Sequence, residues 1–267
     1  MTTATNKLKD KYLVKKRNIL NQMRDGNMTL QEHRFFCIYL SKINPNDIST
    51  RVVRFSISDF KAVMELGRIN IDYLNKVTRS LLSKVVSVPD FNEDGEFIGY
   101  TAFQLFKKCK VRIDGSDPYI EIDAHDDALP LMFDYKNRYF SYQIGNILRL
   151  RSFNQLRMYE LLKQYYTIGE KIYCIEDLRN DLGIGRNEYS SYNNFKVRVL
   201  QSCQKALAEK TDLKFTFEPW GKRGKSGKIL FLKFYIMKND SYKDQITLDQ
   251  FILSGSSFTA DSLLITP

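Results

Sequence analysis

Apolar residues recur at helical spacing early in the chain and then give way to β-branched runs. The stretch "MTLQEHRFFCIYLSKI" places Thr29 three residues before Glu32, a spacing typical of a capping box at a helix N-terminus. The run "RVVRFSI" predicts a short strand, and Ser58 predicts the start of a second helix, "DFKAVMEL". A third helix is expected over residues 70–84. The runs "VVSVP", "FIGYTAFQLFKKCKVRI" and "YIEI", separated by turn signals, then predict a β-ribbon.

The same order of patterns returns in the second half of the chain. Ser152 precedes the helical pattern "FNQLRMYELLKQYY", the run "KIYCI" predicts a short strand, and "IEDLRNDLGI" and "NNFKVRVLQSCQKALAEK" predict two further helices. The runs "DLKFTFEP" and "KILFLKFYI" predict a hairpin. Helix, strand, helix, helix and hairpin is the order of a winged-helix domain. We therefore predict an α+β fold with two tandem winged-helix domains, each a three-helix bundle with a β-hairpin wing.

These patterns also suggest where the domains begin and end. We expect an N-terminal winged-helix domain at residues 12–135 and a C-terminal one at residues 136–238, with most of the linker within residues 131–150. The basic residues 1–11 and the polar, mildly acidic residues 239–267 show no clear periodic pattern. Both ends are therefore expected to be flexible.

The net charge indicates what kind of molecule the protein binds. The 267 residues carry a formal net charge of +10. Residues 186–238 hold twelve Lys or Arg against four Asp or Glu, and residues 6–18 hold six against one. An excess of cations attracts polyanions, and phosphate contacts supply most non-specific affinity for DNA. Charge alone does not distinguish DNA from RNA or from an anionic membrane surface, so the distribution of the side chains must decide.

Several other classes of protein are disfavoured by composition. No apolar run approaches the roughly 20 residues of a membrane span, and the N-terminal stretch lacks the apolar core of a signal peptide. The four cysteines form no C-x-x-C pair, which disfavours a zinc site and a disulfide framework. The two histidines, His33 and His125, lie in separate segments. We expect a cytoplasmic protein with no enzymatic activity, metal or cofactor and no membrane partner.

The stretch "WGKRGKSGK", residues 220–228, allows two interpretations. A nucleotide-binding P-loop needs G-x-x-x-x-G-K-[ST] followed by a helix. The first glycine of that motif would fall at Pro219, and the residues that follow predict a strand. We therefore predict a basic wing whose cations bind DNA phosphates. Those cations are Lys222, Arg223, Lys225 and Lys228.

The helix before this loop has two chemically different faces at 100° per residue. Asn194, Arg198, Gln201 and Lys205 lie on the outer face, and these side-chain types match base edges in the major groove. Lys196, at the edge of the apolar arc, is expected to reach a phosphate. The alternative is an ordinary solvated helix face. The residues expected to face the core are Phe195, Val199, Leu200, Cys203, Ala206 and Leu207.

The third helix of the first domain shows a similar but less basic division. Lys76 and Arg79 face outward, and Ile71, Leu74, Val77, Leu81 and Leu82 are expected to face inward. The ribbon that follows is rich in apolar residues, and such a ribbon can pair with a second chain. The alternative is a ribbon packed on its own core. We expect this domain to make an auxiliary DNA contact and to dimerise.

Several of these stretches resemble one known family. "LRSFNQLRMYELLKQY", "IEDLRNDLGI", "YSSYNNFKVRVL", "LKFTFE" and "LFLKFYI" resemble the second winged-helix domain of the iteron-binding initiators of theta-replicating plasmids. "MTLQEHRFFCIYLSKI" and "LNKVTRSLLSKVVSV" resemble their first domain. The resemblance covers about residues 12–238 in consistent order. By position, it implies a major-groove helix at 193–210, with Lys196 and Arg198 as the contacting basic pair, and a wing at 221–228.

The resemblance also implies a function. Members of this family bind repeated origin sites as monomers, melt DNA with host factors, and recruit the host replication initiator and helicase. Their dimers, which pair through the first domain, commonly repress their own promoter. The family often has an acidic residue and a proline after "RVL", where this chain has Gln201 and Ser202. The alternatives are a tandem winged-helix transcriptional regulator without a replication role, a DNA-nicking or primase-like enzyme, and a scaffold that binds partners through the ribbon alone.

Overall fold

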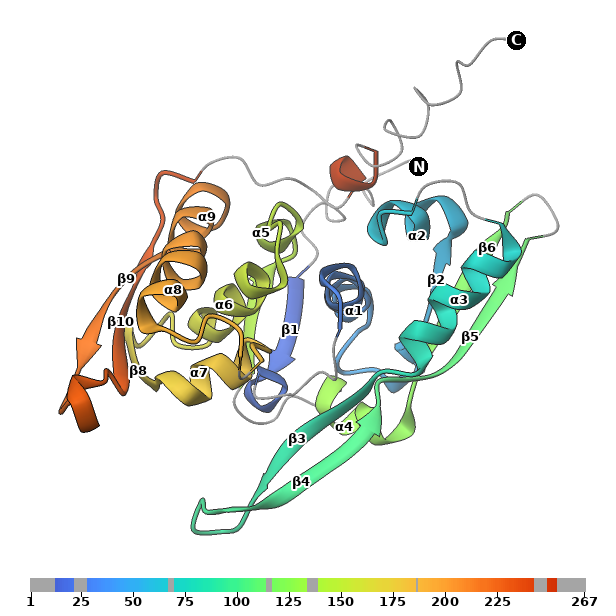
Figure 1. Cartoon of the computed structure of the whole chain (residues 1–267). Coiled ribbons are helices and arrows are strands. Elements are labelled where there is room, and N and C mark those ends of the chain that lie inside the picture. The colour runs from blue at the N-terminus through green and yellow to red at the C-terminus, as the bar shows by residue number, and fades with distance from the viewer. Residues whose placement is uncertain are drawn as a thin grey trace.

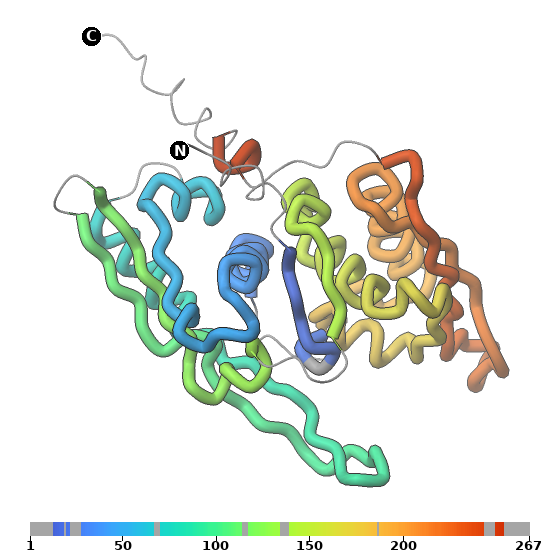
Figure 2. Tube along the Cα trace, turned by 180° about the vertical axis from the view of Figure 1, so that it is seen from behind, coloured from blue at the N-terminus to red at the C-terminus, as the bar shows by residue number. Residues whose placement is uncertain are grey.

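The structure, a computed structural model, describes residues 13–21, 28–66, 70–113, 117–133, 139–185, 187–242 and 249–253. The expected N-terminal extension at residues 1–11 and the expected boundary between residues 135 and 136 lie outside these ranges. The described residues form two halves side by side, with the N-terminal strand β1 (Leu13–Arg17) and helix α1 (Leu30–Lys42) between them (Figures 1 and 2).

From α1 onward the first half follows the predicted order, with one more strand in the ribbon than predicted and a further short helix at its end. Helix α1 leads into strand β2 (Val52–Ser56), and helices α2 (Ile57–Val63) and α3 (Ile71–Leu82) follow. The next elements are strands β3 (Val85–Phe91), β4 (Phe97–Gln104), β5 (Phe106–Arg112) and β6 (Tyr119–Ala124), and then the short helix α4 (Leu129–Met132). The run expected as one strand after Phe97 is divided at Leu105, which is buried.

The second half begins with strand β7 (Tyr139–Gln143) and the short helix α5 (Gly145–Leu148). Its winged-helix elements follow in the predicted order: α6 (Phe153–Lys163), β8 (Glu170–Cys174), α7 (Ile175–Asp181), α8 (Tyr192–Phe195), a π-helical segment (Lys196–Gln201), α9 (Ser202–Lys210), β9 (Leu213–Trp220) and β10 (Phe231–Lys238). Residues 131–150, where most of the linker was expected, therefore hold a strand and a helix.

The two halves share one sheet topology. In the first half the antiparallel strand order is β2-β6-β5, and in the second half it is β8-β10-β9. In both, the strand after the first helix pairs with the last strand of the wing, which closes the sheet. This equivalence confirms the prediction of two tandem winged-helix domains.

The hairpin formed by β3 and β4 has no equivalent among the described strands of the second half. Its two strands pair only with each other among the described strands, and the hairpin projects from the body of the molecule (Figure 1). Apolar side chains are exposed along it, with Phe97, Ile98 and Tyr100 each at least 65% exposed. The apolar ribbon predicted from the sequence is therefore split into this projecting hairpin and the wing strands β5 and β6.

Helix starts follow the predicted caps at two of three positions. Thr29 Oγ1 accepts from the Glu32 amide at 3.2 Å while Glu32 Oε2 accepts from the Thr29 amide at 2.8 Å, which is the predicted capping box. Ser152 caps α6 as expected. For α2 the expectation of Ser58 was wrong, because the Ser56 hydroxyl accepts from the Asp59 amide and the helix begins at Ile57.

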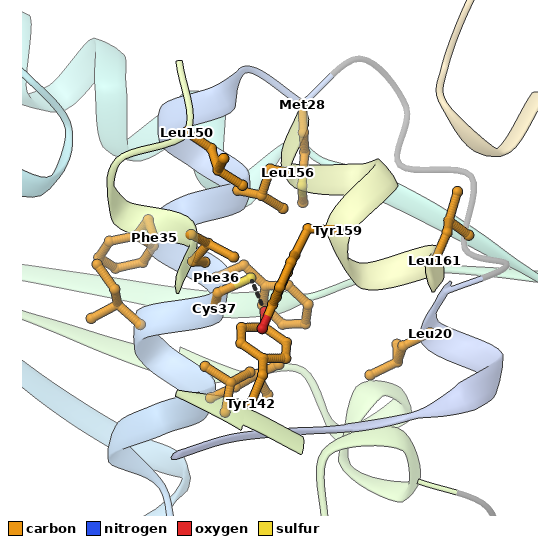
Figure 3. Close-up of a cluster of buried hydrophobic side chains, with 14 of the residues drawn as sticks. Leu20, Met28, Phe35, Phe36, Cys37, Tyr142, Leu150, Leu156, Tyr159 and Leu161 are labelled. Atoms are coloured by element: carbon orange, nitrogen blue, oxygen red, sulfur yellow. Dashed lines mark hydrogen bonds between the residues drawn. The ribbon is translucent and has the colours of Figure 1, made fainter. Parts of the chain in front are cut away.

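Strand β1, near the start of the chain, pairs with the first strand of the second half. It pairs antiparallel with β7, and Val14 lies opposite Tyr142. Behind this two-stranded sheet, α1 and α6 pack together, so one continuous core runs through both halves. Figure 3 shows side chains of this region, where the Tyr142 hydroxyl oxygen lies 3.4 Å from Cys37 Sγ.

Glu160 lies at the centre of this core and is fully buried. Its carboxylate accepts from Lys16 Nζ at 2.8 Å and from the Tyr142 hydroxyl at 2.6 Å, and His33 Nε2 lies 3.0 Å away. Arg157 Nη1 approaches it at 3.4 Å. Burial alone would raise the pKa of Glu160, but the charges of Lys16 and His33 and the hydrogen bond with His33 hold it well below its usual range. The carboxylate is therefore ionised and links both halves.

The described part of the tail contacts the body of the molecule. The Asn239 amide group donates to the carbonyl oxygens of Ala208 and Thr211, which closes the end of α9. Residues 249–253, where the sequence predicts no element, form a helical turn, and the Arg34 guanidinium lies 5.0 Å from the centre of the Phe251 ring. The remaining residues of the expected flexible tail lie outside the described ranges. None of the described helices is both long enough and apolar enough to cross a membrane.

Candidate nucleic-acid interface

Residues 192–210 form one continuous helical rod at the surface of the second half. Ser191 begins it, because its side-chain oxygen accepts from the Asn194 amide at 3.2 Å. The middle of the rod, Lys196–Gln201, is π-helical, and α9 continues from it to Lys210. We call residues 192–210 the recognition helix.

One side of the recognition helix packs into the core as the sequence predicts. Phe195, Val199 and Leu200 are each at most 1% exposed. The other residues predicted to face inward, Cys203, Ala206 and Leu207, are also buried. Gln204 fixes the helix to the wing, because its side-chain amide donates to the Phe215 carbonyl in β9 at 2.9 Å.

The predicted base-reading residues lie together on the opposite side. Asn194, Arg198, Gln201 and Lys205 are all exposed, and Lys196 is half-buried at the edge of this face. The structure gives the side chains of Asn194, Arg198 and Gln201 no hydrogen bond or ion pair within the described ranges. Among the described residues Lys205 pairs with exposed Glu209, at 3.9 Å, and such surface pairs contribute little. These donors and acceptors are therefore accessible to a ligand.

Sequence analysis missed one residue of this face. Val197 is 47% exposed and lies between Asn194, three residues before it, and Gln201, four residues after it. The same helical spacing that selected its neighbours would have selected Val197. Val197 was not predicted, because the prediction of base-reading residues considered polar side chains and Val197 is apolar.

The wing follows the recognition helix directly. Strands β9 and β10 pair from Leu213↔Lys238 to Trp220↔Phe231, and residues 221–230 connect them. Gly221 has φ +71° and Gly227 has φ +73°, conformations that disfavour residues with side chains. The four predicted wing cations, Lys222, Arg223, Lys225 and Lys228, are all exposed.

The exposed cations of the wing and of the recognition helix are together the basic surface of the second half: Lys222, Arg223, Lys225 and Lys228 on the wing, and Arg198 and Lys205 on the helix. Partial burial raises the pKa of Tyr192 in the first turn of the helix, and the positive charge of Arg223 opposes this rise. An anionic polymer lying on this surface would contact both elements. A single polyanion can therefore meet the helix with its base edges and the wing with its phosphates.

Helix α3 of the first half presents a smaller version of the same arrangement. Lys76 and Arg79 are exposed, as predicted, and Leu74 and Leu81 are buried. Ile71, which was expected to face the core, is 51% exposed. Thr78 is buried instead, and its hydroxyl donates to the Leu74 carbonyl at 3.0 Å, which allows a polar residue inside.

Between the projecting hairpin and the second half lies a hollow of about 780 Å³. Phe91, Phe97 and Tyr100 line it from the hairpin, and Ile172 and Tyr173 line it from β8. Because the hairpin stands away from the body, its aromatic side chains are accessible on this side. The hairpin is thus an apolar surface separate from the basic one.

A cluster of possible metal ligands belongs to the buried network. One ligand atom each from His33, Cys37 and Glu160 lies within 4.8 Å of the others. However, Lys16 Nζ lies 2.8 Å from the same carboxylate, and Arg157 also approaches it. These cations already balance the carboxylate, so we interpret the cluster as the structural connection between the halves.

Two family models match the chain in the order of its two halves. The model described as "Initiator Replication protein, WH1" matches residues 13–163, and the model described as "Initiator Rep protein, WH2" matches residues 175–236. No curated protein matches the chain. The second match contains the recognition helix and the wing, and together the two matches cover most of the 267 residues. The chain therefore belongs to the family of initiator replication proteins, DNA-binding proteins of plasmid replication built from two winged-helix domains.

Proposed function

We propose that this protein initiates plasmid replication by binding repeated sites, or iterons, in double-stranded origin DNA. The observation that carries the proposal is the recognition helix, where Asn194, Arg198 and Gln201 are exposed and have no partner within the described ranges. Arg pairs with guanine, and Asn or Gln pairs with adenine, in the major groove. The basic wing beside them supplies phosphate contacts that hold the helix in register.

The two domains have unequal roles in this proposal. Residues 136–238 make the main DNA contact, through the recognition helix and the wing cations. Residues 12–135 make an auxiliary contact through Lys76 and Arg79 on α3. Fewer exposed cations on α3 give a weaker electrostatic contribution, since each neutralised phosphate adds to the affinity.

The first domain also forms the proposed homodimer. Phe97, Ile98 and Tyr100 are exposed on a two-stranded hairpin whose outer edges pair with no other described strand. Exposed apolar edges of this kind associate with a second chain. We propose that the dimer, in equilibrium with the DNA-binding monomer, represses the protein's own promoter.

Origin melting and host recruitment complete the proposal. When several monomers bind adjacent repeats, their combined binding free energy offsets the cost of bending and unpairing a flexible segment of DNA. The host replication initiator and the host helicase then extend the opening. In this proposal the chain itself needs only to bind DNA and to contact the host proteins.

Footprinting on supercoiled DNA that contains the protein's own gene and its flanks tests the proposal. Permanganate, which oxidises unpaired thymines, is applied to the same samples. Protection of several direct repeats, with unpaired thymines nearby, is the expected result. Protection of a single promoter site without unpaired thymines would instead support the tandem winged-helix transcriptional regulator.

A further inference from the structure

Val197 is an apolar residue on an otherwise polar surface. It is 47% exposed in the middle of the recognition helix, between Asn194 and Gln201. Val199, two residues later, is 1% exposed, so the same helix buries a valine where the core needs one. Val197 is therefore not part of the hydrophobic core formed by the described residues.

The backbone around Val197 is also unusual. Residues Lys196–Gln201 form a π-helical segment, and such segments are rare and occur frequently at functional sites. This segment contains Arg198 and Gln201, two of the predicted base-reading residues. Val197 lies in the same segment as these two residues.

The chemistry of Val197 restricts what it can recognise in the major groove. Its side chain has no hydrogen-bond donor or acceptor, so it cannot pair with the polar edges of the bases. Thymine is the only base that presents an apolar group there, its C5-methyl. We propose that Val197 contacts a thymine methyl group in the bound site and selects that base, an inference that rests on the proposed function.

The placement of Val197 fits a contact next to those of its neighbours. One helical turn rises about 5.4 Å, and successive bases on one strand are about 3.4 Å apart. Asn194 and Gln201 lie roughly one turn before and after Val197 on the same side. The thymine therefore lies within one or two base pairs of the bases that these residues read.

Replacing thymine by deoxyuridine, which lacks only the methyl group, tests this contact. The bound site is first obtained by selection from random-sequence duplex DNA with the wild-type protein. Each thymine of the selected site is then replaced singly, and the affinities of the wild-type, Val197→Ala and Val197→Thr proteins are measured. One replacement should weaken wild-type binding about threefold to fivefold, the effect of one lost buried methyl group.

The variants separate a methyl contact from a general effect on affinity. Val197→Ala, which loses both γ-methyl groups, should distinguish the thymine and deoxyuridine forms of that position least, whereas Val197→Thr, which keeps one γ-methyl group, should retain part of the difference. Equal sensitivity of wild type and Val197→Ala at every position would overturn the proposal, and so would the absence of any sensitive thymine. Selection that enriches no site would overturn the proposed function itself and this inference with it.

Discussion

Lys16 Nζ lies 2.8 Å from Glu160 Oε1, although the two residues are 144 positions apart in the chain. Both side chains are fully buried. Lys16 lies on β1 and Glu160 on α6, so this ion pair fixes the N-terminal strand to helix α6 of the second half. Asn21 adds to the connection, because its side-chain amide donates to the Glu160 carbonyl at 2.8 Å. The two halves are therefore joined by a shared polar core.

Glu160→Gln should destabilise the protein strongly. The substitution leaves Lys16 buried without a counter-charge, and breaking a buried ion pair from one side destabilises a protein by about 3–5 kcal/mol. Chemical denaturation followed by circular dichroism measures the change. Glu209→Gln, which removes only an exposed partner of Lys205, is the matched control and should change stability by less than about 0.5 kcal/mol. Equal stabilities of the two variants would contradict the structural role of Glu160.

Stability should fall as the pH is lowered through the acidic range. The pKa of Glu160 is held well below its usual range in the folded state, whereas the unfolded chain has the ordinary value of about 4.3. The unfolded state therefore binds a proton at a pH where the folded state does not. The stabilisation is complete well above pH 4.3 and is lost as the pH falls toward the folded-state pKa. Free energies of unfolding measured between pH 7 and pH 3 check this, and a value that stays constant or rises on acidification would contradict it.

Local patterns predicted the parts of the fold that local physics determines. Thr29 and Ser152 were recognised as caps because a cap depends on residues within one helical turn. The buried face of the recognition helix followed from the 3.6-residue period, and all six of its apolar residues are buried. The same period places the polar residues on the exposed face, whether or not they bind DNA.

Long-range pairing could not be predicted in this way. Strand β1 pairs with β7, and its Lys16 is buried because a carboxylate arrives from α6. No periodicity within either segment encodes a partner more than 100 residues away in the chain. The division of the apolar ribbon at Leu105 was missed for a related reason, since both of its strands read as one continuous β run.

Arg198→Ala should weaken binding to the specific site by about 1–3 kcal/mol and relax the preference at one base position. The reason is the loss of a bidentate contact that distinguishes guanine from the other bases. Arg198→Lys keeps the charge but not the fork of donors, so it should lose most of the same preference. Competition binding with single-base variants of the site measures both effects. Equal losses on specific and scrambled DNA would exclude base reading by Arg198.

Lys225→Ala should weaken binding to all DNA sequences to a similar extent. Lys225 is an exposed wing cation, and a phosphate contact carries no sequence information. The slope of log affinity against log salt should become less steep by about 0.9, the contribution of one phosphate. Titrations at several salt concentrations give this slope. An unchanged slope would show that Lys225 does not touch the DNA backbone.

Tyr100→Ser should shift the proposed equilibrium from dimer to monomer. The side chain is 69% exposed on the projecting hairpin, and an aromatic residue at the centre of an interface commonly contributes about 2 kcal/mol or more. Sedimentation velocity over a range of concentrations measures the dissociation constant, which should rise at least tenfold. Ile168→Ser removes a similarly exposed apolar side chain from the second half and serves as the control. If both variants dimerise like the wild type, the hairpin is not the interface.

The central claim is that the recognition helix and the wing read double-stranded DNA by sequence. A titration of the purified protein tests it most directly, with DNA flanking its own gene and scrambled DNA of equal length as probes, at several salt concentrations. The account predicts affinity for the flanking DNA at least about a thousandfold above that for scrambled DNA near physiological salt, together with a steep salt dependence for both probes. Equal affinity for the two probes would contradict it and would leave a basic protein that binds phosphates alone.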